Sequence, residues 1–174
     1  MILNLHDGST ISVAHLAPRP ITCPCTGLNR DLNIKVIFAN HCYTEKFDES
    51  IHSKEEILLY DAPDRPRVFC PIRHKLSLQL PDIVAGLPTK KVHQTAQQRN
   101  YVYFASIEVT NQIYEVYFML QRAQSDDEAD LRLTVESAYA DDGAPALLKR
   151  PNAIRFHVLA QKVLTNQRIK FAPR

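Results

Sequence analysis

The chain has 174 residues, of which 45% are hydrophobic and 23% are charged, so its composition is that of a globular protein and not of a disordered one. Its formal net charge of +2 is too small to indicate nucleic-acid binding from bulk charge alone. No stretch has the length of apolar residues needed to cross a membrane, and the start of the chain lacks the pattern of a signal peptide. We therefore expect a single cytoplasmic domain with no membrane partner.

The first thirty residues or so are expected to be an appendage to this domain, made of a hairpin and a cysteine-containing turn. Asp7-Gly8 favours a tight turn between two short apolar runs, because both residues tolerate positive φ. Cys23 and Cys25 flank a proline, and we interpret this stretch as a second turn. The apolar run 34–39 then indicates a strand buried on both faces.

Helical segments are predicted on both sides of a central sheet. Pro71 suits the first position of a helix, and Pro81 either kinks the segment of about 71–87 or begins a second helix. A C-terminal helix is predicted over about 152–165. The apolar residues at helical spacing are Ile72, Leu76, Leu80, Val84 and Leu87 in the first segment and Phe156, Leu159, Ala160, Val163 and Leu164 in the second.

Between these segments, residues of about 101–139 hold three strand-like runs in succession, which favours an antiparallel meander. In the third run Leu131, Leu133 and Val135 are expected to face the core. A period of two then extends this core face to Ser137 and Tyr139. The predicted fold class is α+β, with a mostly antiparallel sheet.

A metal site is the first candidate for chemistry. We expect the four cysteines to be thiols or metal ligands, because disulfides are rare in cytoplasmic proteins. Zn²⁺ binds four nitrogen or sulfur ligands in a tetrahedron, and Cys23, Cys25, His41 and Cys42 could supply them for a structural zinc. The alternative is that the cysteines are turn thiols and small buried hydrophobic residues.

A catalytic cluster is the second candidate. Metal-independent cleavage of RNA needs a base, an acid and a cation that stabilises the charge on phosphate, and it requires no cofactor. The residues that could fill these roles are His41, Arg73, His74, Arg99, Ser137 and Tyr139. The alternative for each is a structural role, on the wet side of a helix or as a packing residue of the sheet.

The order of these elements resembles that of a known group of domains. A helix with Arg73 and His74 precedes two aromatic-rich strands and a strand that ends in Val-Glu-Ser-Ala-Tyr. This layout, over about residues 67–140, resembles the Barnase–EndoU–Colicin–RelE-like group of toxin and phage-associated RNase domains. The resemblance implies that the late strands present a Ser or Thr near an aromatic residue, while the preceding helical region supplies a His or Arg.

Two further strings, Asn40-His41-Cys42-Tyr43-Thr44 and Arg99-Asn100-Tyr101, resemble small bacterial proteins described as hypothetical or as stationary-phase growth adaptation. Two hypotheses follow. The first is a toxin-like or phage-associated RNA-cleaving domain whose partners are RNA and an antitoxin or immunity protein. It requires Arg73 and Ser137 to lie on the same side of the sheet. The second is a non-catalytic binding or regulatory module of a bacterial stress or defence system, with a structural zinc and an exposed apolar patch or sheet edge.

Overall fold

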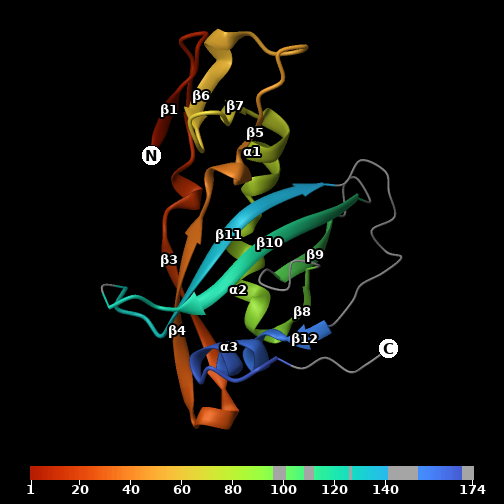
Figure 1. The fold of residues 1–174 in the computed structure, drawn as a ribbon. Helices are drawn as coiled ribbons and strands as arrows, with labels where there is room; N and C mark the ends of the chain where they lie inside the picture. The colour runs from red at the N-terminus through yellow and green to blue at the C-terminus, as the bar shows by residue number, and fades with distance from the viewer. Residues whose placement is uncertain (96–100, 108–111, 126, 141–152, 170–174) are drawn as a thin grey trace.

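The computed structural model describes residues 1–95, 101–107, 112–125, 127–140 and 153–169. Within these residues the fold is α+β, as predicted, and its main layer is a seven-stranded sheet (Figure 1). The strand order is β12-β8-β9-β10-β11-β4-β3, and neighbours are antiparallel except for β11 and β4, which are parallel. The strands are β3 (Arg19–Cys25), β4 (Arg30–Phe38), β8 (Lys91–Gln94), β9 (Tyr101–Ile107), β10 (Gln112–Arg122), β11 (Leu131–Ala140) and β12 (Ala153–Arg155). The predicted meander is therefore confirmed as β9-β10-β11.

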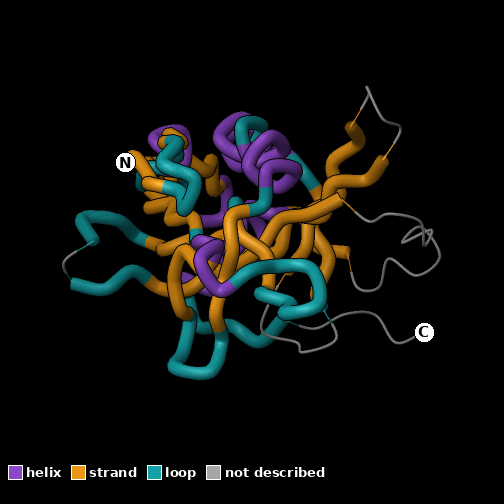
Figure 2. Tube along the Cα trace, turned by 90° about the horizontal axis from the view of Figure 1, so that it is seen from above, coloured by secondary structure: helices purple, strands orange, loops and turns teal. Residues whose placement is uncertain are grey.

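Two smaller sheets stand at one end of the main sheet. β1 (Ile2–Asn4) and β2 (Thr10–Ser12) form the predicted hairpin, in whose turn Gly8 has a φ of 82°. β5 (Thr44–Lys46), β7 (Pro66–Phe69) and β6 (Ile57–Tyr60) form a three-stranded antiparallel sheet in the order β5-β7-β6. Figure 1 shows the hairpin beside this sheet, and Figure 2 shows the region around the N-terminus from above.

The predicted helical segment over 71–87 is confirmed as two helices, α1 (Pro71–Ser77) and α2 (Leu80–Gly86). Pro81 stands in the first turn of α2, where a missing N–H costs no intrahelical hydrogen bond. The C-terminal helix, α3 (Phe156–Leu164), begins later than about residue 152, because 153–155 extend as β12 and pair with β8. Within the described part of the chain, no helix combines the length and apolarity that a membrane crossing requires. Short 3-10 turns are η1 (Ala14–Leu16), η2 (Thr26–Leu28), η3 (Asn40–Cys42), η4 (Lys54–Glu56) and η5 (Leu87–Thr89).

One face of the main sheet carries the hydrophobic core. Helices α2 and α3 cover this face, and the rings of Phe156 on α3 and Phe118 on β10 lie 6.0 Å apart between centroids. Burial of each such large apolar side chain contributes about 1.5–3 kcal/mol to stability. These two helices contribute five fully buried side chains, Leu80, Val84, Phe156, Leu159 and Ala160, and Leu87 of the following 3-10 turn is buried as well.

A β-bulge in β11 overturns the predicted orientation of its last residues. Tyr117 pairs with Ser137 while Phe118 pairs with Val135, so Glu136 is an extra residue on β11. An extra residue reverses the alternation of the residues that follow it. Ala138 therefore continues the buried face, whereas Ser137 and Tyr139 are half-buried. The prediction that these two residues extend the core face of Leu131, Leu133 and Val135 was wrong.

The cysteine-containing stretch also differs from its predicted turn. Cys23 and Cys25 lie in β3, where they alternate with exposed neighbours and are buried against the core. Cys23 pairs with Leu32 of β4 in an antiparallel register. The following strand alternates as well, because Ile34 is buried while Lys35 is half-buried, so the prediction of burial on both faces was also wrong. The turn is formed instead by η2, which follows β3.

Candidate functional site

The candidate site lies at the end of β11, where η3 and α1 come together. Because β4 runs parallel to β11, the chain that leaves β4 continues alongside the same end of β11. There the Ala39 N–H donates to the Val135 carbonyl at 2.9 Å, and η3 begins with the next residue. The parallel pairing thus places His41 near the end of β11, although the two are far apart in the sequence.

Arg73, on the first turn of α1, contacts two other predicted site residues. Its guanidinium carbon lies 5.4 Å from the centroid of the Tyr139 ring, and its Nη1 donates to the His41 carbonyl at 3.1 Å. A cation over an aromatic face contributes about 0.5–1 kcal/mol when exposed and about 2 kcal/mol when desolvated. Among the described residues Arg73 has no carboxylate partner, so its charge and its other N–H groups are available to a ligand.

The imidazole of His41 is held by Asp61, the residue that follows β6. Nε2 of His41 lies 2.6 Å from Oδ2 of Asp61, and Nδ2 of Asn40 donates to Oδ1 of the same carboxylate at 2.8 Å. Burial acts to raise the pKa of Asp61, but the hydrogen bonds from Asn40 and His41 and the charges of His41 and Arg67 lower it below its ordinary value. An ionised carboxylate only accepts hydrogen bonds, so Nε2 of His41 carries the proton. In the neutral imidazole Nδ1 is then the basic nitrogen, on a side chain that is 37% exposed.

Two tyrosines and a glutamate complete the polar cluster. The rings of Tyr139 and Tyr117 are stacked at 5.5 Å between centroids. The Tyr117 hydroxyl donates to Oε2 of Glu115, a residue that is only 6% exposed. Burial, followed by the interactions with Glu115 and Tyr139, raises the pKa of Tyr117. The hydroxyl of Tyr117 therefore stays protonated and serves as the donor that a buried carboxylate needs.

Two buried polar atoms at this end of the sheet have no hydrogen-bond partner among the described residues. They are Oδ1 of Asn40 and the hydroxyl of Tyr114. Burial raises the pKa of Tyr114, and the charge of the nearby Arg73 opposes that change. Buried polar atoms without partners are uncommon in folded proteins, because each costs about 1–3 kcal/mol. Their presence beside Arg73 supports a functional interpretation of this cluster.

The remaining predicted catalytic residues are His74, Ser137 and Arg99, and the described ones, His74 and Ser137, have no contact with Arg73 comparable to that of Tyr139. Nε2 of His74 lies 2.9 Å from the Ser12 carbonyl, and its ring lies against His15, so it faces the N-terminal hairpin. Ser137 precedes Tyr139 by two residues on the same strand after the bulge, so both share the face against which Arg73 lies. Arg99 falls outside the described residues.

The residues predicted to bind zinc are not gathered at one point. The Cys42 thiol lies 3.9 Å from the Val135 carbonyl, and Cys25 lies 3.9 Å from Oε1 of Gln161. Burial raises the pKa of Cys23 to about 11 and that of Cys42 to about 12, which keeps both thiols protonated at neutral pH. Within the described ranges no three or more His, Cys, Asp or Glu side chains are arranged to hold a metal ion. The structural zinc therefore gains no support from these positions.

Sequence reasoning missed Asp61 and Glu115. Asp61 lies in a turn with two prolines, where an aspartate is ordinary, and only the tertiary structure brings it to His41. Glu115 sits among β-branched and aromatic residues of β10. A glutamate that is buried in such a strand is a signal in itself, because an unpaired buried carboxylate is costly.

Comparison of the sequence with known proteins places the chain in a family. A family model described as the YjaZ family matches residues 3–164. A relative in Escherichia coli (strain K12), protein YjaZ, is 24% identical over 135 residues, which cover 77% of this chain and 72% of that protein. No solved structure gives a significant match.

Proposed function

This chain belongs to the YjaZ family, and we propose that it cleaves RNA by acid–base catalysis at the cluster of His41, Asp61, Arg73 and Tyr139. The observation that carries the proposal is the position of Arg73, which contacts both the Tyr139 ring and the His41 backbone. A cation is thereby held against the ring of a phenol and against the backbone of the residue whose imidazole Asp61 orients. Phosphodiester cleavage needs a base, an acid and a cation, which an imidazole, a phenol and a guanidinium can supply.

In the proposed reaction Nδ1 of His41 takes the proton of a ribose 2′-hydroxyl, and the 2′-oxygen attacks the adjacent phosphorus. The bond from phosphorus to the 5′-oxygen breaks, and that oxygen takes a proton from the Tyr139 hydroxyl. Asp61 acts as a positioning residue, because its carboxylate keeps the Nε2 proton of His41 in place. Arg73 stabilises the charge that builds on the phosphate oxygens.

The proposal includes a toxin-like or phage- and defence-associated role in the cytoplasm, where RNA is accessible. Arg73 has no carboxylate partner in the described part of the chain, which leaves its charge for phosphate. The neighbouring Arg67 is different, because Asp61 lies 3.6 Å from its Nε and the Thr44 carbonyl accepts from its Nη2. Arg73 is therefore the phosphate ligand of the pair.

The test is incubation of total RNA with purified wild-type protein and with variants. His41→Gln keeps a donor for Asp61 but removes the base, and Arg73→Lys keeps the charge but removes the planar fork. We expect each to lower the cleavage rate by about 100-fold or more. His74→Gln is the matched control, because His74 is the neighbour of Arg73 on α1 and faces the hairpin.

Cleavage that both His41→Gln and Arg73→Lys leave unchanged would remove this site from the reaction. An absence of any cleavage by the wild-type protein would argue against the function itself. Thermal unfolding of each variant must remain within a few degrees of the wild type, so that a lost fold is not mistaken for lost chemistry.

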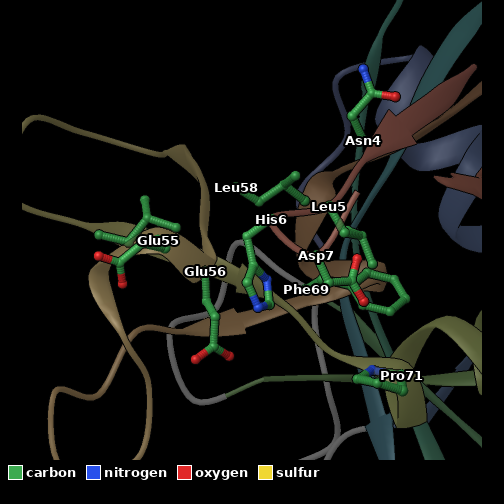
Figure 3. Close-up of a pocket in the computed structure, with 10 residues that line it drawn as sticks. Asn4, Leu5, His6, Asp7, Glu55, Glu56, Leu58, Phe69 and Pro71 are labelled. Atoms are coloured by element: carbon green, nitrogen blue, oxygen red, sulfur yellow. The ribbon is translucent and has the colours of Figure 1, made fainter. Parts of the chain in front are cut away.

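A second candidate function, a protein-binding module, is favoured by a separate groove. The groove has a volume of about 440 Å³ and lies between the hairpin turn and β6, the last strand of its small sheet. Figure 3 shows Leu5, Leu58 and Phe69 together with the carboxylates of Asp7, Glu55 and Glu56 around it. Large exposed hydrophobic side chains lie in the same N-terminal part of the chain, among them Ile2 and Tyr60.

This second candidate predicts that a basic extended segment of a partner, such as an antitoxin or immunity protein, binds along β6. Its test is pull-down of a purified candidate partner with wild-type protein and with the Glu55→Lys variant. Equal capture by both would argue against the groove.

A further inference from the structure

A cationic pocket lies where β8, β12 and α3 meet, toward the end of the molecule away from α1 (Figure 1). Its volume is about 510 Å³, and Lys91, Arg155 and His157 are the charged or titratable side chains that line it. Pro24, Thr26, Pro88 and Thr89 form the rest of the lining, which includes no carboxylate among the residues that the structure describes. The pocket therefore concentrates positive charge in a chain whose net charge is only +2.

Lys91 and Arg155 are directly opposite each other on neighbouring strands. β12 pairs with β8 in an antiparallel register that matches Arg155 with Lys91. Such partners place their Cβ atoms about 4.5–5.5 Å apart on the same face, and like charges in this arrangement destabilise a sheet. Both residues are exposed, and neither forms an ion pair with another described residue. An anion bound between them would convert this repulsion into attraction.

The start of α3 adds to the positive potential. Arg155 is its N-cap but makes no side-chain capping hydrogen bond, and the first turn contains no acidic residue. The N–H groups of a first helical turn carry a partial positive charge that favours anions. His157 stands in that turn, and Thr26 adds a hydroxyl to the lining of the pocket. The strand pair, the start of the helix and the lining residues thus all favour a negatively charged ligand.

We infer that this pocket binds the phosphate monoester of a nucleotide, with Lys91 and Arg155 on the phosphate and Pro24 against the nucleoside. Arg155 offers a planar fork for two phosphate oxygens, and Lys91 offers a point charge. A volume of about 510 Å³ exceeds what one phosphate fills, and the exposed ring of Pro24 adds an apolar surface that suits a flat base. The phosphate could belong to a free nucleotide or to the end of an RNA. This inference does not rest on RNA cleavage.

Isothermal titration calorimetry tests the inference at constant ionic strength. The probes are adenosine 5′-monophosphate, adenosine, and a 2′-O-methyl RNA octamer with either a 5′-phosphate or a 5′-hydroxyl, which the proposed reaction cannot cleave. We expect adenosine 5′-monophosphate or the phosphorylated octamer to bind, and their unphosphorylated counterparts to bind at least tenfold more weakly. Binding of the mononucleotide alone assigns a free nucleotide, and binding of the octamer alone assigns an RNA end.

Two pairs of variants locate the binding. Lys91→Gln and Arg155→Gln are expected to weaken the phosphate-dependent binding by about tenfold or more. Lys90→Gln and Arg168→Gln remove the same charge from residues that do not line the pocket, and they are expected to bind as the wild type does. Failure of both phosphorylated probes to bind, or binding that Lys91→Gln and Arg155→Gln leave unchanged, would overturn the inference. RNase activity plays no part in either readout.

Discussion

The cluster around Arg73 and the pocket around Arg155 use similar cationic groups in opposite electrostatic settings. In the cluster, His41 and Arg67 share the carboxylate of Asp61, and Tyr117 satisfies the carboxylate of Glu115. In the pocket, Lys91 and Arg155 face each other with no acid among the described residues of the lining. The first arrangement is mostly neutralised from within the chain, and the second is not.

Because of this difference, the loss of a charge should change the stability of the fold in opposite directions in the two regions. Where opposite charges are paired and partly buried, removal of one leaves its partner desolvated and destabilises the fold. Where like charges are opposed, removal of one relieves repulsion and stabilises it. Stability measurements can therefore separate the two regions before any ligand or reaction is known. Four experiments use this contrast.

The largest effect is expected from Asp61→Ala. This change removes the acceptor of His41 and Asn40 and leaves the buried guanidinium of Arg67 without its carboxylate. We expect a loss of about 1–2 kcal/mol in the free energy of unfolding, below the value for a fully buried pair because Asp61 is partly solvated. Urea denaturation measures it, with Asp64→Ala in the same turn as the control. Equal stability of the two variants would mean that the cluster is not internally paired.

Replacement of Tyr139 tests the aromatic part of the cluster. Tyr139→Leu loses both the stacking on Tyr117 and the contact with the Arg73 guanidinium. We expect it to lower the free energy of unfolding by about 1 kcal/mol. Tyr139→Phe keeps the ring and should remain within about 0.5 kcal/mol of the wild type in the same assay. A destabilisation by Phe as large as that by Leu would show that the hydroxyl, and not the ring, holds this position.

The pKa of Asp61 makes part of this stability depend on pH. A carboxyl whose pKa is lower in the folded than in the unfolded state stabilises the fold above its unfolded pKa of about 3.9. That contribution is lost as the pH falls through the folded-state value. The stability difference between wild type and Asp61→Asn should therefore be constant from pH 7 to about pH 5 and shrink below about pH 4. A difference that grows on acidification would contradict the lowered pKa.

The smallest effect, of opposite sign, is expected in the pocket. Lys91→Glu replaces a like-charge pair with an opposite-charge pair across β8 and β12. We expect the free energy of unfolding to rise by about 0.5 kcal/mol, even though nucleotide binding is lost. Urea denaturation without phosphate measures this rise, with Lys90→Glu as the control. Destabilisation by Lys91→Glu alone would mean that Lys91 has a structural partner and that the two regions do not differ.

Sequence patterns predicted the elements well where one local rule decided them. The Asp7-Gly8 turn, the helix start at Pro71 and the alternating strands of the meander each depend on neighbouring residues, and each is confirmed. The proline between Cys23 and Cys25 favours a turn, but both cysteines lie in a strand. Pro24 is nevertheless tolerated in β3, which is the last strand in the sheet order.

The sequence also predicted part of the candidate site, and the rest depended on the tertiary structure. The chain order of helix, strands and a terminal Ser-Ala-Tyr was enough to select Arg73, Ser137 and Tyr139, and Arg73 does contact Tyr139. The orientation of Tyr139 was not available from periodicity, because one extra residue at Glu136 reverses it. A bulge is a property of two paired strands, and a single strand carries no local mark of it.

Residue types and their spacing thus established an α+β chain with a central meander and a short set of polar candidates. Tertiary structure alone decided which candidates meet, because Asp61 reaches His41 through the pairing of β5, β6 and β7. It also decided that Lys91 and Arg155 face each other, through a register between strands more than fifty residues apart in the sequence. Contacts of this kind depend on strand order and register, which are set by the packing of the whole core and not by any local run of residues.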